Sequence, residues 1–370
     1  MKFISKLNVA LVLAMLATAL RAEAVTIEEA ALPKAVTPVE MKIGGRVEVS
    51  TSAGETPAYE FQWPGIYFEC SFEGEGVFFE IGKGDIIYHV LVDGVLQPPL
   101  KKPKRGYYHL RGLTPGAHTV RLEAVTESQD QPNRFGGFLA DSKTRPLAPS
   151  PQRRMIEFIG DSHTVGYGNT SATRQCTREE VWSTTDTSQS FATLVAKHYG
   201  AEYQVNAYSG RGIVRNYNGF ASFTLPELYP YILFDRARKV NQPEWKPAVV
   251  VINLGTNDFS TALNPGERWK TRDALREDFV ETYCAFVKEL RKEFPNTYFI
   301  LAANDMADGE IQREVRKVVD KLTADGERRI GFVPFSNLKL TGCDWHPNVE
   351  DDQHMMADLV TYIDAHVGKW

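Results

Sequence analysis

The chain has little cysteine, no excess of positive charge and only one long apolar run. Its four cysteines in 370 residues are too few for a disulfide scaffold, and their spacing fits no metal-binding motif. The formal net charge is −5, without a basic stripe, which argues against nucleic acid or an anionic membrane as a partner. The apolar run, residues 9–20, holds twelve residues, and a membrane-spanning helix needs roughly 20.

This apolar run has the setting of a signal peptide. Lys2 and Lys6 precede it, and Ala22-Glu23-Ala24 places small residues where a signal peptidase reads the chain. We expect removal of residues 1–24, which takes away three positive charges and one negative charge and leaves a net charge of −7. The sequence therefore predicts a secreted or periplasmic protein with no membrane partner after cleavage.

Export permits a disulfide. Cys70 follows an aromatic, strand-like run, and Cys284 lies within an apolar helical pattern, so both are expected to be buried thiols. Cys176 and Cys343 fall in loops rich in Gly, Thr and Asp, and they are the pair predicted to form a bridge.

The chain changes character near residue 145. Before that point, short β-rich runs such as "GIYFECSF" and "IIYHVLVDG" alternate with turn signals, which is typical of an all-β sandwich. We assign residues 25–145 to this sandwich and the Pro-rich, basic residues 146–154 to a linker.

Residues 155–370 alternate apolar strands with helical patterns. The run "AVVVINL" lacks alternation, as expected of a strand that is covered on both faces. This arrangement predicts a three-layer α/β/α domain around a parallel sheet, with helices near 188–199, 272–294, 309–325 and 352–367.

Polar residues collect where the predicted strands end, and ligands of open parallel sheets bind beyond those ends. The first four strands end in Gly160-Asp161-Ser162, Ser209-Gly210-Arg211-Gly212, Gly255-Thr256-Asn257-Asp258 and Asn304-Asp305, and Gly342-Cys343-Asp344-Trp345-His346-Pro347 precedes the last helix. Serine, glycine, asparagine and histidine brought to one edge of one sheet predict an acyl-transfer site.

Each residue type has a role in this chemistry. Ser162 would attack an ester carbonyl, and His346 would accept its proton. The oxyanion would bind the backbone amide of Ser162, an amide of Gly210 or Gly212, and the side chain of Asn257. No cofactor or metal is needed, and we expect a monomer.

The blocks "GDSHT", "SGRG", "GTND" and "DWHP" resemble those of the SGNH (GDSL-type) hydrolase superfamily. The versions "GDSHTVGYGN", "SGRGIVRNYNG", "INLGTNDFS" and "GCDWHPN" are similar to carbohydrate esterase family 2, over essentially the whole mature chain. The resemblance implies an N-terminal jelly roll joined to an SGNH domain. It also implies removal of O-acetyl groups from acetylated polysaccharides or oligosaccharides of plants, such as xylan or glucomannan.

One position departs from the superfamily pattern. Most SGNH enzymes place an aspartate three residues before the histidine, whereas here Cys343 stands there and Asp344 is two residues before His346. We predict that Asp344 orients His346 as the third member of a triad. The alternative is a Ser-His dyad with a backbone carbonyl in that role, as in some resembling esterases.

Several other residues have two interpretations. Trp345 and Tyr217 are predicted to stack on a sugar ring, although most aromatic residues are core. His163 is interpreted as a wall of the serine loop and Asp258 as a support for its own loop. His354, with Asp351 and Asp352, is interpreted as an ordinary helix start rather than a metal site.

Three function classes remain open. The first is a carbohydrate O-acetyl esterase. The second is another SGNH enzyme, either a short-chain esterase or lipase, or an O-acetyltransferase. The third is a non-catalytic carbohydrate-binding protein, against which the complete set of Ser162, Gly210, Asn257 and His346 argues.

Overall fold

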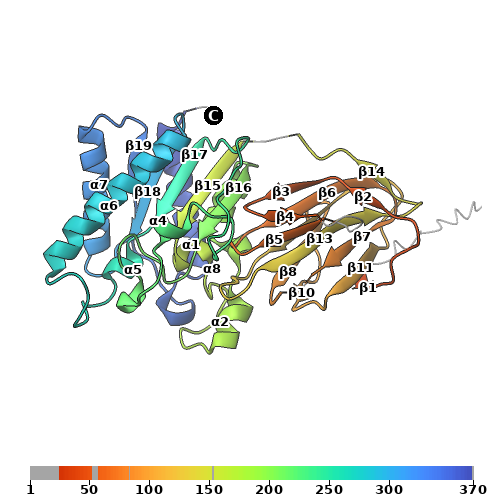
Figure 1. Cartoon of the computed structure of the whole chain (residues 1–370), viewed down its shortest axis with the longest axis horizontal. Coiled ribbons are helices and arrows are strands. Elements are labelled where there is room, and N and C mark those ends of the chain that lie inside the picture. The colour runs from red at the N-terminus through yellow and green to blue at the C-terminus, as the bar shows by residue number, and fades with distance from the viewer. Residues whose placement is uncertain (1–24, 52–56, 83, 152–153, 369–370) are drawn as a thin grey trace, which may run out of the picture.

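The computed structural model describes residues 25–51, 57–82, 84–151 and 154–368, in which an antiparallel β part is followed by an α/β part (Figure 1). The predicted signal peptide lies outside the described residues. The predicted fold class is confirmed, because two antiparallel sheets precede a parallel sheet that is flanked by helices. None of the helices within the described ranges is both long enough and apolar enough to cross a bilayer.

The β part consists of two sheets, with strand orders β1-β11-β7-β13-β5-β4 and β10-β8-β12-β6-β14. The first sheet contains β1 (Thr26–Glu29), β2 (Thr37–Val39), β4 (Glu48–Ser50), β5 (Ala58–Phe61), β7 (Gly76–Ile81), β11 (Gly106–Arg111) and β13 (Asn133–Ala140). The second contains β3 (Met41–Gly44), β6 (Tyr67–Glu73), β8 (Ile87–Val92), β9 (Val95–Leu96), β10 (Leu100–Lys101), β12 (Ala117–Ala124) and β14 (Arg145–Leu147). Alternate residues of β6 and β8 are buried, so one face of the second sheet packs on the first. The stacked rings of Phe68 and Phe135, 4.4 Å apart, join the two sheets.

The last strand of the sandwich, β14, starts at Arg145 and extends into residues that the sequence analysis assigned to the linker. β14 pairs with β6 through Pro146 and Leu147, two residues that were assigned to the linker. Strand pairing in the sandwich therefore continues to residue 147.

The α/β part has a five-stranded parallel sheet of order β16-β15-β17-β18-β19. Its strands are β15 (Met155–Gly160), β16 (Glu202–Ala207), β17 (Val249–Asn253), β18 (Tyr298–Asn304) and β19 (Ile330–Phe335). Its helices are α1 (Ser162–Val165), α2 (Arg178–Thr184), α3 (Phe191–His198), α4 (Leu225–Leu228), α5 (Thr256–Phe259), α6 (Arg272–Glu293), α7 (Glu310–Ala324) and α8 (Val349–His366). Short 3₁₀ turns are η1 (Thr187–Gln189), η2 (Tyr217–Gly219) and η3 (Cys343–Trp345).

Both faces of this sheet are covered, as the apolar strands predict. Ile156 and Phe158 of β15 belong to the same buried cluster as α3 and α8. The next residue, Ile159, points to the other face and belongs to the cluster that includes the buried faces of α6 and α7. Alternate residues of one strand thus serve two helical layers, which gives the three-layer arrangement.

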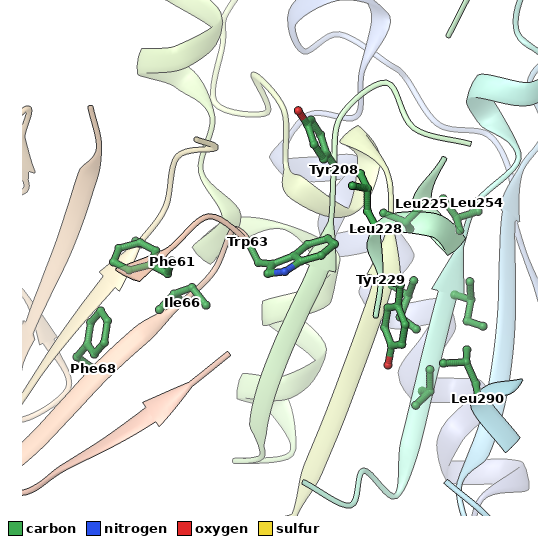
Figure 2. Close-up of a cluster of buried hydrophobic side chains, with 14 of the residues drawn as sticks. Phe61, Trp63, Ile66, Phe68, Tyr208, Leu225, Leu228, Tyr229, Leu254 and Leu290 are labelled. Atoms are coloured by element: carbon green, nitrogen blue, oxygen red, sulfur yellow. The ribbon is translucent and has the colours of Figure 1, made fainter. Parts of the chain in front are cut away.

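The sandwich and the α/β part share one apolar cluster. Trp63, just after β5, lies between Ile66 on the sandwich side and Tyr208 and Tyr229 on the other side (Figure 2). The Trp63 side chain is 1% exposed, and its Nε1 donates to the carbonyl of Tyr231 at 3.2 Å. Because the indole is buried by both parts, it fixes their relative position.

A buried ion pair also crosses this interface. Arg46 of the sandwich lies 3.3 Å from Oε1 of Glu157 in β15, and both side chains are nearly inaccessible. Glu157 also accepts from Asn206, Tyr229 and Trp245 at 2.7–2.9 Å. The carboxylate is therefore fully hydrogen-bonded, which a buried charge requires.

Candidate active site

Ser162 is placed by a sharp strand-to-helix turn. β15 ends at Gly160, and Asp161 caps α1 by accepting the His163 amide at 3.1 Å, so Ser162 is the first helical residue. A side chain at Gly160 would lie 2.0 Å from Oγ1 of Thr164, so glycine permits this tight turn. The Ser162 hydroxyl therefore stands at the carboxyl edge of the parallel sheet.

His346 reaches that hydroxyl from the far end of the chain. Its Nε2 lies 2.8 Å from Oγ of Ser162, 184 residues away in sequence. Its Nδ1 hydrogen-bonds the backbone carbonyls of Cys343 at 2.9 Å and Asp344 at 3.2 Å. Because carbonyls only accept, Nδ1 must carry the proton, and Nε2 is left free to accept the proton of Ser162. Burial lowers the pKa of His346, which favours this neutral form.

The Asp344 side chain does not occupy the position that the sequence suggested. Its carboxylate accepts a hydrogen bond from the Tyr167 hydroxyl at 3.0 Å, while the backbone carbonyls occupy Nδ1 of His346. The reason lies in the backbone, since Asp344 and Trp345 adopt left-handed φ values of 51° and 64°. This turn presents carbonyl oxygens to the imidazole and the carboxylate to Tyr167.

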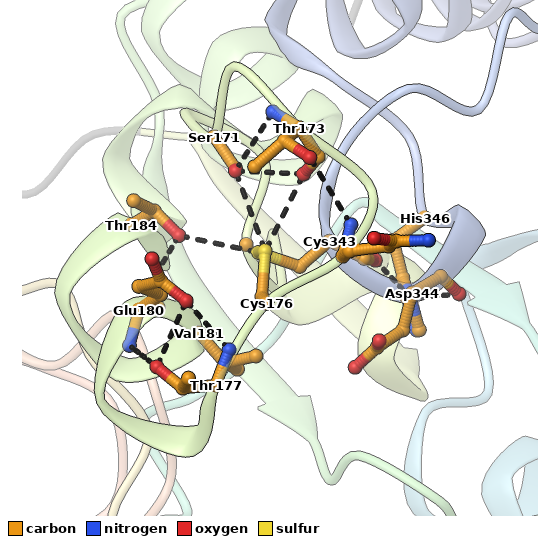
Figure 3. Close-up of a disulfide and its surroundings, with 12 residues drawn as sticks. Ser171, Thr173, Cys176, Thr177, Glu180, Val181, Thr184, Cys343, Asp344 and His346 are labelled. Atoms are coloured by element: carbon orange, nitrogen blue, oxygen red, sulfur yellow. Dashed lines mark hydrogen bonds between the residues drawn. A yellow bond between two sulfur atoms is a disulfide. The ribbon is translucent and has the colours of Figure 1, made fainter.

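The histidine loop is anchored to the loop after α1. The predicted Cys176–Cys343 disulfide is confirmed, and it lies beside His346 (Figure 3). The Asp344 amide donates to the Arg174 carbonyl at 2.7 Å, and Nε of Arg174 donates to the Leu340 carbonyl at 2.7 Å. These contacts hold the left-handed turn in place. The other two cysteines are free and buried, as predicted: Cys70 and Cys284.

Asn257 and the glycine loop meet near Ser162. Nδ2 of Asn257 donates to the Arg211 carbonyl at 2.9 Å and makes a longer contact, 3.3 Å, with Oδ2 of Asp161. The amide of Gly212 donates to Asn216 Oδ1 at 3.3 Å, and a side chain at Gly212 would lie 2.1 Å from a carbonyl oxygen. Gly212 is thus committed to loop packing, which leaves Gly210 as the candidate glycine donor.

Asp258 supports the glycine loop, and not only its own loop as the sequence interpretation had it. Its carboxylate accepts the backbone amides of Ile213, Val214 and Arg215 at 2.9–3.0 Å. Burial raises the pKa of Asp258 to about 6 even though these three donors act in the opposite direction. The residue beside Asn257 therefore holds the neighbouring loop in register.

The predicted sugar-stacking residues are on the surface. Trp345 is 59% exposed beneath the guanidinium of Arg174, which lies 4.0 Å from its ring, and Tyr217 is 52% exposed. Trp345 directly precedes His346, and the amide of Tyr217 donates to the Gly210 carbonyl at 2.9 Å. By contrast, His163 is buried, and its Nδ1 lies 3.4 Å from Nδ2 of Asn304.

The acidic start of α8 is a helix cap. Asp351 completes a capping box with Asn348, and Asp352 accepts Asn169 Nδ2 and the Phe191 amide, each at 2.9 Å. His354 lies 3.7 Å from Asp358 instead. Among the residues that the structure describes, no group of three or more His, Cys, Asp or Glu side chains could hold a metal ion.

Three residues near this site were not singled out from the sequence: Tyr167, Arg174 and Glu127. Tyr167 lies inside the serine block "GDSHTVGYGN", so its position in that block was an available signal. Arg174 and Glu127 act through long-range contacts that leave no local pattern.

Comparison with known proteins agrees with this geometry. Residues 43–151 match the Carbohydrate esterase 2 N-terminal family, and residues 158–360 match the GDSL-like Lipase/Acylhydrolase family. The chain is 44% identical to an acetylxylan esterase / glucomannan deacetylase of Cellvibrio japonicus, over 90% of this chain and 93% of that protein.

Solved structures are similar across both parts of the chain. A carbohydrate esterase whose active site displays divergent catalytic and non-catalytic binding functions has a TM-score of 0.84 at 43% identity, covering 89% of this chain and 98% of that one. A family two carbohydrate esterase from Clostridium thermocellum in complex with cellohexaose has a TM-score of 0.75 at 29% identity, covering 88% and 98%. The chain is a carboxylic ester hydrolase and belongs to carbohydrate esterase family 2.

Proposed function

We propose that this enzyme removes O-acetyl groups from acetylated plant polysaccharides or oligosaccharides, such as xylan or glucomannan, through an acetyl-Ser162 intermediate. The observation that carries the proposal is the 2.8 Å contact between Oγ of Ser162 and Nε2 of His346. The substrate class is supported by the 44% identical relative, which is an acetylxylan esterase / glucomannan deacetylase.

In the first half of the reaction, Oγ of Ser162 bonds to the acetyl carbonyl carbon, and its proton passes to Nε2 of His346. The carbonyl oxygen becomes an oxyanion. The oxyanion accepts hydrogen bonds from the backbone amides of Ser162 and Gly210 and from Nδ2 of Asn257. Asn257 gives up its long 3.3 Å contact with Asp161 to make this bond. The bond to the sugar oxygen then breaks, and that oxygen takes the proton from His346.

In the second half, water attacks acetyl-Ser162 and gives its proton to Nε2 of His346. The carbon–Oγ bond breaks, Ser162 recovers the proton, and acetate leaves. His346 acts as a base and then as an acid in each half. The backbone carbonyls of Cys343 and Asp344 keep its ring in the required tautomer, so the site works as a Ser-His dyad.

The sugar binds beside the dyad on exposed aromatic faces. Trp345 adjoins His346 in sequence, Tyr217 contacts the Gly210 loop, and both rings are more than half exposed. A related family two esterase is known in complex with cellohexaose, a chain of sugar rings of the kind that stacks on aromatic faces.

The enzyme is exported and acts as a monomer. The Cys176–Cys343 disulfide supports export, because such bonds persist in oxidising compartments. Sequencing the N-terminus of the mature protein tests this. Val25 is the expected first residue, and a mature protein that begins at Met1 would refute cleavage after Ala24.

Acetate release from acetylated xylan, acetylated glucomannan and other acetylated polysaccharides tests the function. We expect release from at least one polymer, no hydrolysis of 4-nitrophenyl palmitate, and complete loss of release in Ser162→Ala. Because one hydroxyl contributes little to packing, that variant should unfold at the wild-type temperature. Unchanged release in Ser162→Ala would rule out the acyl-enzyme.

A further inference from the structure

A carboxylate from the sandwich reaches the edge of the candidate oxyanion site. Glu127 follows β12, and its Oε1 accepts the backbone amide of Ser209 at 2.8 Å. Ser209 directly precedes Gly210 in the loop that leaves β16. The contact therefore crosses from the β part to the α/β part within one residue of the proposed glycine donor.

The segment that Glu127 holds also carries other contacts of the site. The carbonyl of Arg211, two residues after Ser209, accepts Nδ2 of Asn257 at 2.9 Å, and the carbonyl of Gly210 accepts the amide of Tyr217. A shift of residues 209–211 would thus move two proposed oxyanion donors together.

The chain just before Glu127 is anchored on both parts of the molecule, through the backbone of Val125. The amide and hydroxyl of Thr187 donate to the carbonyl of Val125 at 3.0 and 3.1 Å, and the amide of Val125 donates to Ile87 in the sandwich. Burial raises the pKa of Glu127, whereas the bonds from Ser209 and the charge of Arg211 lower it. Burial raises the pKa of Tyr167, which contacts the His346 ring, and the charge of Glu127 acts in the same direction.

We propose that Glu127 is a positioning residue for this esterase, which holds the Ser209 amide so that the adjacent Gly210 amide and Asn257 point at the oxyanion. The inference rests on the proposed acyl-enzyme function. It makes the sandwich a part of the catalytic site rather than a separate appendage, because the carboxylate comes from the sandwich and the donors come from the α/β part.

The test is steady-state kinetics on 4-nitrophenyl acetate with Glu127→Ala, Glu127→Asp and Glu127→Gln. The alanine variant should lower kcat by about tenfold to 10²-fold, the range expected when a catalytic group is slightly misplaced, and leave KM within about twofold. Asp should be intermediate, because its carboxylate is retained but its shorter side chain reaches less far. Gln should stay within about threefold of wild type, because its amide oxygen still accepts from Ser209.

A double-mutant cycle separates positioning from a general structural role. In an Asn257→Ala background, where one oxyanion donor is already lost, Glu127→Ala should cost clearly less than it costs in wild type. Equal costs in both backgrounds, unchanged kcat in Glu127→Ala, or a Gln variant as impaired as Ala would each overturn the proposal.

Two controls complete the design. Lys42→Ala removes another contact between the two parts, the 2.7 Å pair with Glu202 at the opposite end of β16, and should leave kcat unchanged. Ser162→Ala distinguishes the two possible failures. If Ser162→Ala is inactive while Glu127→Ala has normal activity, only the positioning role is wrong. If Ser162→Ala keeps full activity, the acyl-enzyme mechanism itself is refuted. Thermal unfolding checks that each variant is folded. If Glu127→Ala does not fold, the kinetics of Glu127→Asp decide the test instead.

Discussion

The carboxylate of Asp344 accepts a hydrogen bond from the hydroxyl of Tyr167 at 3.0 Å, and the Tyr167 ring lies 4.3 Å from the ring of His346. The aspartate thus contacts the imidazole through a neighbouring ring, while its carbonyl oxygen contacts Nδ1. This relationship separates two roles that a triad aspartate combines, because orientation comes from the backbone and the negative charge acts from a distance.

The first prediction follows from this separation. Asp344→Ala should lower kcat by less than about tenfold, whereas the comparable loss in a Ser-His-Asp protease costs about 10⁴. Kinetics on 4-nitrophenyl acetate measure the effect. His346→Ala is the control for a severe loss, and Tyr167→Phe keeps the ring and removes only the hydroxyl. A thousandfold loss in a folded Asp344→Ala enzyme would restore the triad.

The second prediction concerns pH. His346 acts as a base only when neutral, and burial lowers its pKa from the ordinary 6.5. Activity should therefore persist as pH falls through 6.5, and the acid-side midpoint of kcat/KM should lie below that value. Because the Asp344 charge acts to raise the pKa of His346, Asp344→Ala should move the midpoint lower still. A wild-type midpoint above 6.5 would contradict the dyad, since it would mean that a carboxylate stabilises the imidazolium.

The third prediction concerns the proposed side-chain donor to the oxyanion. Asn257→Ala should lower kcat by about 10²–10³ and change KM little, because the donor interacts with a charge that develops only in the transition state. Asn296 is exposed in the turn between α6 and β18, and it provides a control of the same residue type. Asn296→Ala should behave as wild type. If Asn257→Ala raises KM and leaves kcat intact, Asn257 binds the substrate instead.

The fourth prediction concerns the disulfide. Replacing both Cys176 and Cys343 by serine should destabilise the fold by about 2–5 kcal/mol, because the bridge joins residues 167 positions apart. It should also lower kcat, since His346 follows Cys343 by three residues. Thermal unfolding and kinetics with and without dithiothreitol measure both effects.

The double serine variant is its own control for the reductant. Cys70 and Cys284 are buried thiols that form no bridge, so dithiothreitol should change the wild type and leave the variant unaffected. Equal unfolding temperatures for the wild type and the variant would show that the hydrogen bonds of Arg174 hold the histidine loop without the disulfide.

The sequence predicts most of this site because parallel strands bring their carboxyl ends to one edge. Ser162, Gly210 and Asn257 each follow a strand, so their meeting is a consequence of topology. The topology of the strands does not determine which group hydrogen-bonds Nδ1 of His346. That partner depends on left-handed φ values at Asp344 and Trp345, which neither residue type requires.

Glu127 was unpredictable for a different reason. It lies 82 residues from Ser209 and in the other half of the molecule, within a loop of ordinary polar composition. Strand and helix periodicities describe elements, and they carry no information on which loop of a sandwich will face which loop of a neighbouring sheet. The same limit explains why the sequence analysis ended the sandwich at residue 145, although the Pro-containing segment 145–147 pairs with β6.

The wide separation of Ser162 and His346 sets an order of events during biosynthesis. A ribosome that has just added Ser162 must add 184 more residues before His346 exists, which takes roughly 10–40 s at about 5–20 residues per second. The histidine loop can be locked only after Cys343 has also emerged, because its partner Cys176 waits far upstream. Ser162, the proposed nucleophile, is therefore made early and remains inert, and the growing chain can acquire esterase activity only after His346 and Cys343 have been delivered.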